Sequence, residues 1–259
     1  MTTQQQPQRR TILVTGAAKR IGRQLALAFA REGYSIIIHY HTSGGEAETL
    51  LDEVRTLNPD GHHSLKCCDL TDAIAVLGMF RDLSAAGSLP SVVVNNASCY
   101  RRRPLCGESP SELLNDLSVN FLGPFEVMRQ YHEFSGSGHI INLLDYRVGL
   151  ADPASGGYGL AKKSLRDATE ACALEWAPSF RVNAIAPGLV LSPPGVPPER
   201  LERLVERIPL GCRTTEADLC EAALFLERTS GVTGLTLYVD GGLHLLGAGH
   251  TGERTATGR

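Results

Sequence analysis

The sequence predicts one α/β domain built on a doubly wound parallel sheet of seven strands, with helices on both faces. Short apolar runs of the kind found in buried strands alternate along the chain with longer segments of helical spacing. The first run leads into a glycine-containing turn and then a helix. No repeat or linker divides residues 11–246, so we expect a single domain there, between a frayed N-terminus (1–10) and a disordered tail (247–259).

The composition argues against several classes of function. The chain is 42% apolar, enough for a large core. Its formal net charge of −3 does not indicate binding to nucleic acid or to an anionic membrane. No apolar run is long enough to span a membrane, and the N-terminus lacks the apolar segment of a signal peptide. The seven cysteines form no Cys-x-x-Cys pair, so we interpret them as reduced thiols of a cytoplasmic protein. No metal site is predicted.

The first strand (11–15) and the first helix (20–31) flank the turn Thr-Gly-Ala-Ala-Lys-Arg-Ile-Gly. Such a turn gathers unpaired backbone N–H groups at a helix N-terminus and favours a pyrophosphate. An ordinary strand-to-helix turn is the alternative. One glycine allows the tight turn and the other lets the helix pack closely on the sheet. The cofactor contacts predicted here are Gly16, Lys19, Arg20, Ile21 and Gly22.

The second strand (35–40) ends in His-Tyr-His-Thr-Ser and lacks the acidic residue that binds the ribose 2′-hydroxyl in NAD-selective folds. Imidazoles, hydroxyls and Lys19 would tolerate a 2′-phosphate, which favours NADPH. A polar strand end without a ligand is the alternative. The contacts predicted at this strand end are His39, Tyr40, His41, Thr42 and Ser43.

The rest of the chain continues the alternation of strands and helices. Further strands are expected at residues 64–67, 91–95, 140–144, 181–186 and 235–239. Further helices are expected at residues 46–57, 72–87, 199–207 and 216–227, and a long one opens near Gly157. The proline-rich segment 189–198 is interpreted as a loop that covers the substrate.

The helix that opens near Gly157 carries Tyr158 and Lys162 on one face, because they are four residues apart. A neighbouring ammonium group favours the phenolate, so we expect a lowered pKa for Tyr158 and a better proton relay at neutral pH. Chance spacing is the alternative for the pair alone. Asp145 ends the preceding strand and Asn120 lies on an earlier helix.

Together with the glycine turn, these residues resemble the short-chain dehydrogenase/reductases, Rossmann-like enzymes whose active site is Asn, Ser, Tyr and Lys. Asn120, Tyr158 and Lys162 match three of these positions, and Asp145 replaces the serine. The resemblance implies that Asp69 lies beside the adenine, although capping of the next helix is its alternative role. The cofactor contacts implied by the resemblance are Asp69, Leu70, Asn96, Ala97, Ser98, Tyr158, Lys162, Pro187 and Gly188.

More narrowly, the glycine turn and Asp145 resemble the pteridine reductases and dihydromonapterin reductases. The likeness extends over about residues 11–246 and includes the aromatic residue Tyr100, which is expected to stack on a heteroaromatic ring, with a partly buried loop tyrosine as the alternative. Arg101, Arg102 and Arg103 are expected to be solvated, with contact to an acidic substrate tail as the alternative. The resemblance implies a homotetramer and substrate contacts by Arg20, Ser98, Tyr100, Asp145, Tyr158 and Leu189.

The chemistry of Asp145 agrees with this narrower resemblance. Reduction of a ketone builds negative charge on oxygen, which a serine hydroxyl stabilises and an ionised aspartate repels. Reduction of a pterin C=N bond needs a proton at the ring nitrogen, which Tyr158 with Asp145 is expected to relay. Lys162 is expected to hold the nicotinamide ribose, with Asn120 supporting it through a water.

We therefore predict NADPH-dependent reduction of a dihydropterin, of the dihydrobiopterin or dihydromonapterin type, or of dihydrofolate. Two alternatives remain. One is a carbonyl reductase of the 3-oxoacyl type, in which an aspartate has replaced the serine by drift and a keto substrate is used. The other is a non-catalytic NADP(H)-binding regulator, against which the intact Asn, Tyr and Lys positions argue.

Overall fold

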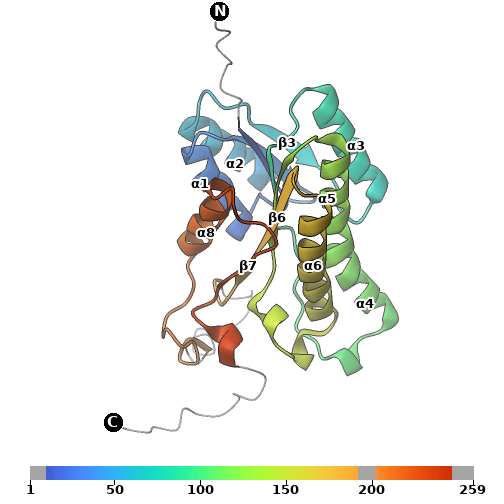
Figure 1. Ribbon diagram of the computed structural model, residues 1–259, viewed down its shortest axis with the longest axis vertical. Helices are drawn as coiled ribbons and strands as arrows, with labels where there is room; N and C mark the ends of the chain where they lie inside the picture. The colour runs from blue at the N-terminus through green and yellow to red at the C-terminus, as the bar shows by residue number, and fades with distance from the viewer. Residues whose placement is uncertain (1–9, 192–201, 203, 247–259) are drawn as a thin grey trace, which may run out of the picture.

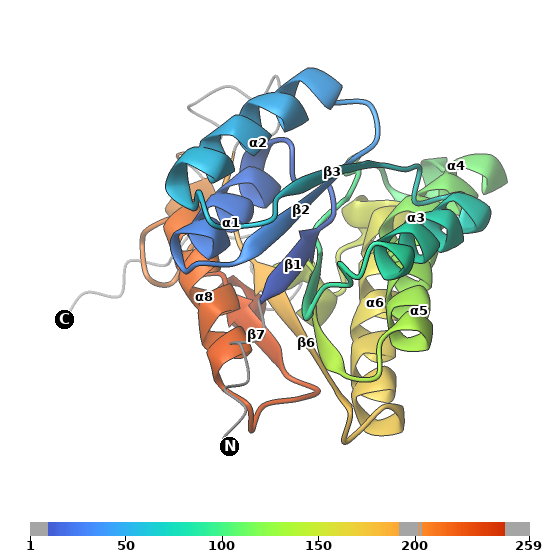
Figure 2. The same cartoon turned by 90° about the horizontal axis from the view of Figure 1, so that it is seen from above.

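The computed structural model describes residues 10–191, 202 and 204–246, and it confirms the predicted fold class. One parallel sheet of seven strands crosses the molecule in the order β3-β2-β1-β4-β5-β6-β7 (Figures 1 and 2). The strands are β1 (Thr11–Val14), β2 (Ser35–Tyr40), β3 (Ser64–Cys67), β4 (Val92–Asn95), β5 (Gly138–Leu143), β6 (Phe180–Pro187) and β7 (Thr236–Val239).

Helices cover both faces of the sheet (Figure 1). One face is covered by α1 (Arg20–Arg31), α2 (Gly44–Leu57) and α8 (Glu216–Arg228), and the other by α3 (Ala73–Ala85), α5 (Gly123–Phe134) and α6 (Gly156–Glu175). The helix α4 (Pro110–Leu117) packs on α6 and runs into α5 through the π-helical turn η2 (Ser118–Leu122). Short 3-10 turns are η1 (Leu105–Gly107), η3 (Tyr146–Gly149), η4 (Pro153–Ser155) and η5 (Leu243–Leu246).

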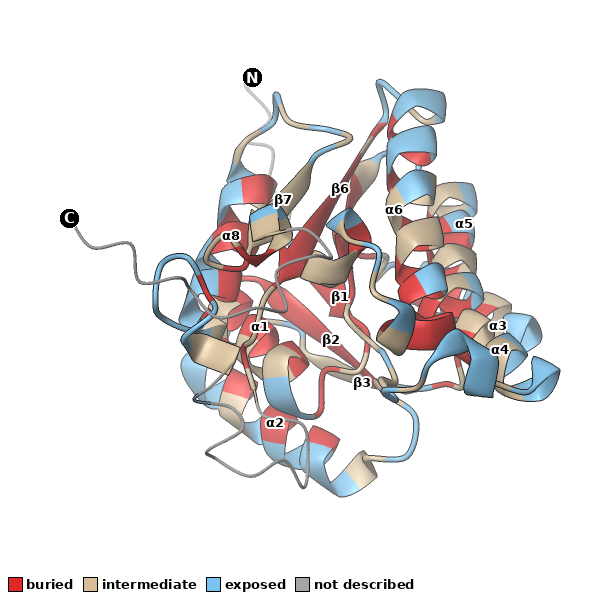
Figure 3. Ribbon diagram, turned by 90° about the horizontal axis from the view of Figure 1, so that it is seen from below, coloured by how far each residue is buried: buried red, intermediate tan, exposed pale blue. Residues whose placement is uncertain are grey.

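Two apolar cores lie on the two faces of the sheet, because successive side chains of a strand point to opposite sides. Ile12 and Val14 of β1 pack in the core under α1 and α8, whereas Leu13 packs in the core under α3 and α5. Strands covered on both faces read as continuous apolar runs rather than alternating ones. Figure 3 shows the result, with buried central strands and helices exposed along their outer sides.

The predicted strands and most predicted helices are confirmed, with ends that differ by a few residues. The prediction missed α4, which opens with a capping box between Ser109 and Glu112. The suggested cap of α3 was wrong. Asp72 caps that helix, and Asp69 instead accepts hydrogen bonds from the backbone N–H and the hydroxyl of Thr71.

Some predicted segments lie wholly or partly outside the described residues. They are the frayed N-terminus, the proline-rich loop, the helix at 199–207 and the tail from 247. In the part of the chain that is described, none of the helices is both long and apolar enough to cross a membrane.

The sheet order reverses between β1 and β4. The chain moves outward from β1 to β2 and β3, and then returns to place β4 on the other side of β1. Ligands of open α/β sheets bind at the carboxyl ends of the strands next to such a switch point. Most of the predicted site residues lie at or just after the carboxyl ends of β1 to β6, and Asn120, Tyr158 and Lys162 lie on the helical segments η2 and α6.

Candidate active site

The loops that follow β1 and β4 are joined tightly at the switch point. The hydroxyl of Thr15 accepts hydrogen bonds from the backbone N–H groups of Asn96 and Ala97, at 2.9 and 3.0 Å. The Asn96 amide donates back to the carbonyls of Thr15 and Gly16, at 2.9 and 3.2 Å. A Cβ added to Gly16 would lie 3.0 Å from the Ala97 Cα. The two predicted cofactor-binding segments therefore form one surface.

The N-terminus of α1 is shaped to receive an anion. Lys19 occupies the N-cap without a side-chain cap, and no acidic residue lies in the first turn, so backbone N–H groups are left unpaired there. A Cβ on Gly22 would come within 2.5 Å of the Asn96 amide nitrogen and the Gly16 carbonyl oxygen. Arg20 has a left-handed φ of +54° at the position that is usually the family's middle glycine. These features fit a dinucleotide pyrophosphate.

His39 does not reach the cofactor side with its ring, which corrects the predicted contact to a 2′-phosphate. The residue is 2% exposed. Nδ1 accepts from the Gly16 N–H at 3.1 Å, and Nε2 lies 3.0 Å from the Cys68 carbonyl oxygen. Burial lowers the pKa of His39 to about 4, so the ring is neutral and braces the glycine turn.

The other residues predicted to contact a 2′-phosphate lie at and just after the end of β2. His41 and Thr42 are exposed, and Ser43 stands at the N-cap of α2 without a side-chain cap bond. Lys19 pairs with Glu46 at 2.6 Å, so a lysine contact to a phosphate requires it to leave that carboxylate. Asp69 lies 4.0 Å from the His41 ring.

Asp145 and Tyr158 meet at the end of β5. The phenol O–H of Tyr158 donates to Asp145 Oδ2 at 3.1 Å. Tyr158 is buried, whereas Asp145 is partly exposed. The predicted pairing of a carboxylate with the tyrosine is therefore present in the geometry.

The predicted lowering of the Tyr158 pKa is wrong for the cofactor-free enzyme. Burial raises this pKa well above its usual value, and the carboxylate of Asp145 raises it further. Lys162 Nζ lies 5.9 Å from the tyrosine ring centre and donates to the Leu143 carbonyl at 2.7 Å. Burial lowers the pKa of Lys162 itself to about 8. Desolvation is therefore the largest cause of both pKa shifts.

The side chain of Asn120 is fully used by hydrogen bonds to the protein, and the water bridge from this residue to Lys162 stays a prediction. Its Oδ1 accepts from the Ser98 hydroxyl at 2.7 Å and from the Cys99 N–H at 3.0 Å. Its Nδ2 donates to the carbonyls of Cys99 and Asp116, at 3.0 and 3.1 Å. The residue sits in the π-helical turn η2 and fixes the loop that follows β4.

The ring of Tyr100 lies against that of Tyr158, edge to face, with centres 4.7 Å apart. This places the predicted stacking residue beside the proposed proton donor. In the same loop Arg101 and Arg102 are exposed, as expected, whereas Arg103 forms an ion pair with Glu112.

Pro187 is the last residue of β6 and pairs with Val239 of β7, and Gly188 follows it. The Gly188 N–H donates to the Val239 carbonyl at 2.9 Å, and a Cβ on this glycine would come within 2.6 Å of the Asp240 Cα. Leu189 is partly exposed.

Sequence reasoning missed two residues that shape this region. Arg147 pairs with Asp145, at 3.0 Å between Nη1 and Oδ2. Glu108 accepts the Gly157 N–H with both carboxylate oxygens, at 3.0 and 2.9 Å, and so holds the N-terminus of α6. Arg147 could have been found from its spacing, because it lies two residues after Asp145. Glu108 is 49 residues from its partner Gly157, so the sequence held no signal for that contact.

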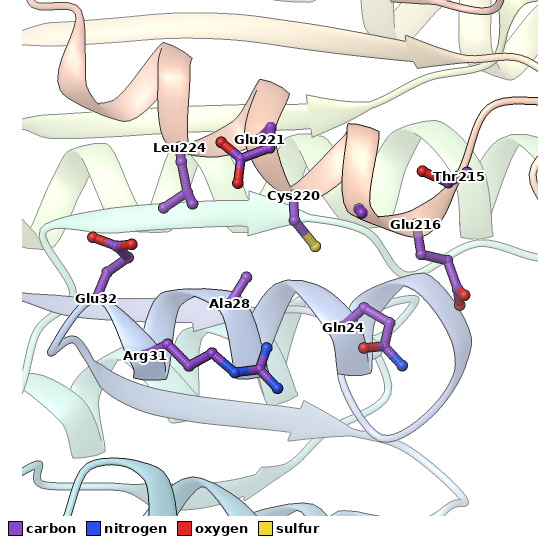
Figure 4. Close-up of a pocket in the computed structure, with 10 residues that line it drawn as sticks. Gln24, Ala28, Arg31, Glu32, Thr215, Glu216, Cys220, Glu221 and Leu224 are labelled. Carbon is purple, nitrogen blue, oxygen red and sulfur yellow. The ribbon is translucent and has the colours of Figure 1, made fainter.

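A groove of about 520 Å³ lies elsewhere, between α1 and α8 (Figure 4). Arg31 and Glu32 line it from α1, and Glu216, Cys220 and Glu221 from α8. None of its lining residues belongs to the predicted site.

Comparison with known proteins agrees with this geometry. The chain belongs to the short-chain dehydrogenase/reductase superfamily, since residues 16–244 match the family model described as enoyl-(acyl carrier protein) reductase. Among curated relatives, it is 30% identical over 250 residues to the 3-oxoacyl-(acyl-carrier-protein) reductase FabG of Staphylococcus aureus strain Mu50, covering 91% of this chain and 98% of that protein. It is 29% identical over 277 residues to pteridine reductase 1 of Leishmania tarentolae, covering 90% and 96%.

Among solved structures, the fold matches FolM alternative dihydrofolate reductase 1 from Brucella canis, complexed with NADP. The TM-score is 0.83 at 28% identity, covering 91% of this chain and 94% of the other. The same protein from Brucella suis, also in complex with NADP, gives a TM-score of 0.85 at 28% identity. These relatives include reductases of different substrate classes. Membership of the family therefore shows oxidoreductase chemistry, and the substrate has to be inferred from the site.

Proposed function

We propose that this protein is an NADPH-dependent reductase of dihydropterins, of the dihydrobiopterin or dihydromonapterin type, or of dihydrofolate. The observation that carries the proposal is the hydrogen bond from Tyr158 to Asp145, where carbonyl reductases of the family have a serine. A carboxylate there repels a developing oxyanion, but it is compatible with protonation of a ring nitrogen. Similarity to pteridine reductase 1 and to FolM supports the same substrate class.

NADPH fits the residues present. Under this proposal the N-terminus of α1 holds the pyrophosphate, with Arg20 beside it, and His41 and the N-terminus of α2 face the 2′-phosphate. The complexes of the FolM relatives with NADP support this choice of cofactor. When bound, NADPH supplies the hydride.

In the proposed reaction Tyr158 is the proton source. Its raised pKa keeps the phenol protonated at neutral pH. The single O–H donates to Asp145 in the free enzyme and would turn from that carboxylate to the ring nitrogen to give up its proton. The phenolate that results lies near the ammonium group of Lys162, which attracts it. Tyr100, held against Tyr158, offers a face on which a flat pterin ring stacks.

A 3-oxoacyl reductase is the second candidate, because FabG is a curated relative that this chain covers nearly in full. It would require Asp145 to bind its proton or to turn away from a ketone oxygen. Activity on a 3-oxoacyl ester with no activity on pterins would favour this candidate.

The test is oxidation of NADPH with dihydrobiopterin, dihydromonapterin and dihydrofolate, alongside a panel of ketones. Replacement of Tyr158 by Phe removes the proton and is expected to lower turnover at least 100-fold, within the usual range for loss of a general acid, while NADPH binding stays within a few fold. Unchanged turnover in Tyr158→Phe would contradict the assigned proton donor.

The proposal includes a homotetramer. Leu114 of α4 and Leu160 and Leu174 of α6 are exposed, at 59%, 43% and 84%, on neighbouring helices of one face. Packing against another copy would remove the apolar surface of these side chains from water. Light scattering tests this assembly directly, and a mass below that of four chains would refute it.

A further inference from the structure

Arg147 lies beside the pair of Asp145 and Tyr158 and is enclosed by charged and aromatic groups. Its side chain is 13% exposed. Its Nη1 donates to both oxygens of Asp145, at 3.1 and 3.0 Å, and its backbone N–H donates to Oδ1 at 2.9 Å. Its Nε donates to Asp152 at 3.0 Å. The guanidinium therefore bridges two carboxylates and sets the orientation of one.

The same guanidinium lies over two aromatic rings. Its carbon is 5.5 Å from the ring centre of Tyr100 and 4.6 Å from that of Tyr146. Contacts between a guanidinium and an aromatic face at this distance are attractive, more so when shielded from water. Arg147 thus links the proposed stacking residue to Asp145.

The loop that carries Arg147 is fastened to α6, which limits its movement. Lys163 Nζ donates to the Leu150 carbonyl at 2.6 Å, and Arg166 Nη1 donates to the Val148 carbonyl at 2.9 Å. The Ser155 hydroxyl donates to the Asp152 carbonyl at 2.8 Å. A charge held in place in this way acts without reorganisation when charge develops nearby.

Proton transfer from Tyr158 creates a charge conflict that Arg147 is placed to resolve. The phenolate forms in hydrogen-bond contact with the carboxylate of Asp145, and two like charges at that distance repel strongly. Asp145 raises the pKa of Tyr158, and Arg147 lowers it. The other groups around the guanidinium are Asp152 and Tyr146 from its own loop, Tyr158 from α6 and Tyr100 from the loop after β4. Lys162 of α6 interacts with Asp145 from the other side of the pair.

We propose that Arg147 is a positioning residue for the reduction, which holds Asp145 as the hydrogen-bond acceptor of Tyr158 and offsets the carboxylate charge when the phenolate forms. The destination of the proton, a pterin ring nitrogen, rests on the proposed function. The ion pair and its effect on Asp145 do not depend on the substrate.

The first experiment therefore needs no substrate. Infrared difference spectra are recorded near pH 6 between each protein and the same protein carrying Asp145→Asn. With Arg147 present, the Asp145 signal is that of a carboxylate. In Arg147→Met, the carboxylate loses both hydrogen bonds from Nη1, so its stretching bands are expected to shift in frequency. Carboxylate bands at the same frequency in Arg147→Met would overturn the proposal.

The second readout is the pH dependence of kcat/KM, measured with dihydropterin or, if only ketones are reduced, with a 3-oxoacyl ester. We expect Arg147→Met to lower kcat/KM about 100-fold and to move the acidic limb of the profile upward by at least one pH unit, whereas Arg147→Lys restores the limb. Arg166→Met, which removes an arginine that only fastens the loop, serves as the control and leaves the limb in place. An equal fall at every pH in Arg147→Met would show a merely structural role and overturn the proposal. Absence of dihydropterin turnover in the unsubstituted enzyme refutes the proposed function alone.

Discussion

Replacement of Lys162 by Met is expected to stabilise the cofactor-free protein while abolishing turnover. Burial lowers the pKa of Lys162 from 10.5 to about 8. The unfolded chain binds this proton up to about pH 10.5 and the folded chain only below about pH 8. The folded state therefore carries a penalty that is complete below about pH 8 and vanishes as the pH rises through 10.5.

The magnitude follows from the size of the shift. Each pKa unit corresponds to about 1.4 kcal/mol, so the penalty at pH 7 is about 3 kcal/mol. Methionine cannot donate to the Leu143 carbonyl, which Lys162 does at 2.7 Å, and the lost hydrogen bond costs about 1 kcal/mol. The variant is thus expected to be more stable by about 2 kcal/mol at pH 7 and about equal at pH 9.5, where most of the penalty has gone.

The assay is denaturant unfolding of the cofactor-free proteins at both pH values. Lys163→Met is the matched control, because Lys163 also donates to a carbonyl, that of Leu150 at 2.6 Å, but is only partly buried. It is expected to lose up to about 1 kcal/mol at either pH. A Lys162→Met protein that is destabilised at pH 7 as much as the control would refute the idea that the active-site lysine is held at a cost in stability.

Two further predictions concern the cofactor side. Arg20→Gly relieves the left-handed φ of +54° and is expected to raise the free energy of unfolding by about 1 kcal/mol while weakening NADPH binding. Denaturant unfolding measures the first effect and titration with NADPH the second. An unchanged free energy of unfolding would show that the backbone there is not strained. The depressed pKa of His39 predicts that stability is complete above pH 6.5 and falls by up to about 3 kcal/mol as the pH drops to about 4, because the unfolded chain binds the proton first. His39→Gln should lack that part of the loss, and an identical pH dependence would contradict the buried neutral ring.

The sheet and the order of its elements could be predicted from the sequence because strands buried on both faces, such as Ser35–Tyr40, stand out as apolar runs between polar segments. The pairing of Asp145 with Tyr158 could be anticipated because the family pattern fixes both positions. The role of His39 could not be predicted, because a histidine at a strand end is interpreted as a cofactor contact until its burial is known. The direction of the Tyr158 pKa was also misjudged, since helix spacing reports neighbours but says nothing about desolvation.

The contacts of Arg147 and Asn120 could not be predicted from the sequence either. The hydrogen bonds of Asn120 run to a loop about 20 residues away, and the residue lies in a π-helical turn that the sequence pattern did not predict. Arg147 lies two residues from its partner, but its contacts with two aromatic rings arise only when the loops after β4 and β5 are brought together.

The central claim is that Asp145 directs the site toward a ring C=N bond. The most direct test compares kcat/KM for a dihydropterin with kcat/KM for a 3-oxoacyl ester, with NADPH as the cofactor. The ratio of the two values is measured in the unsubstituted enzyme and in Asp145→Ser. The account predicts a ratio well above one in the unsubstituted enzyme and a fall of at least tenfold in Asp145→Ser, because the serine hydroxyl donates to a ketone oxygen that the carboxylate repels. A ratio below one before substitution, or one that does not change on substitution, would contradict it.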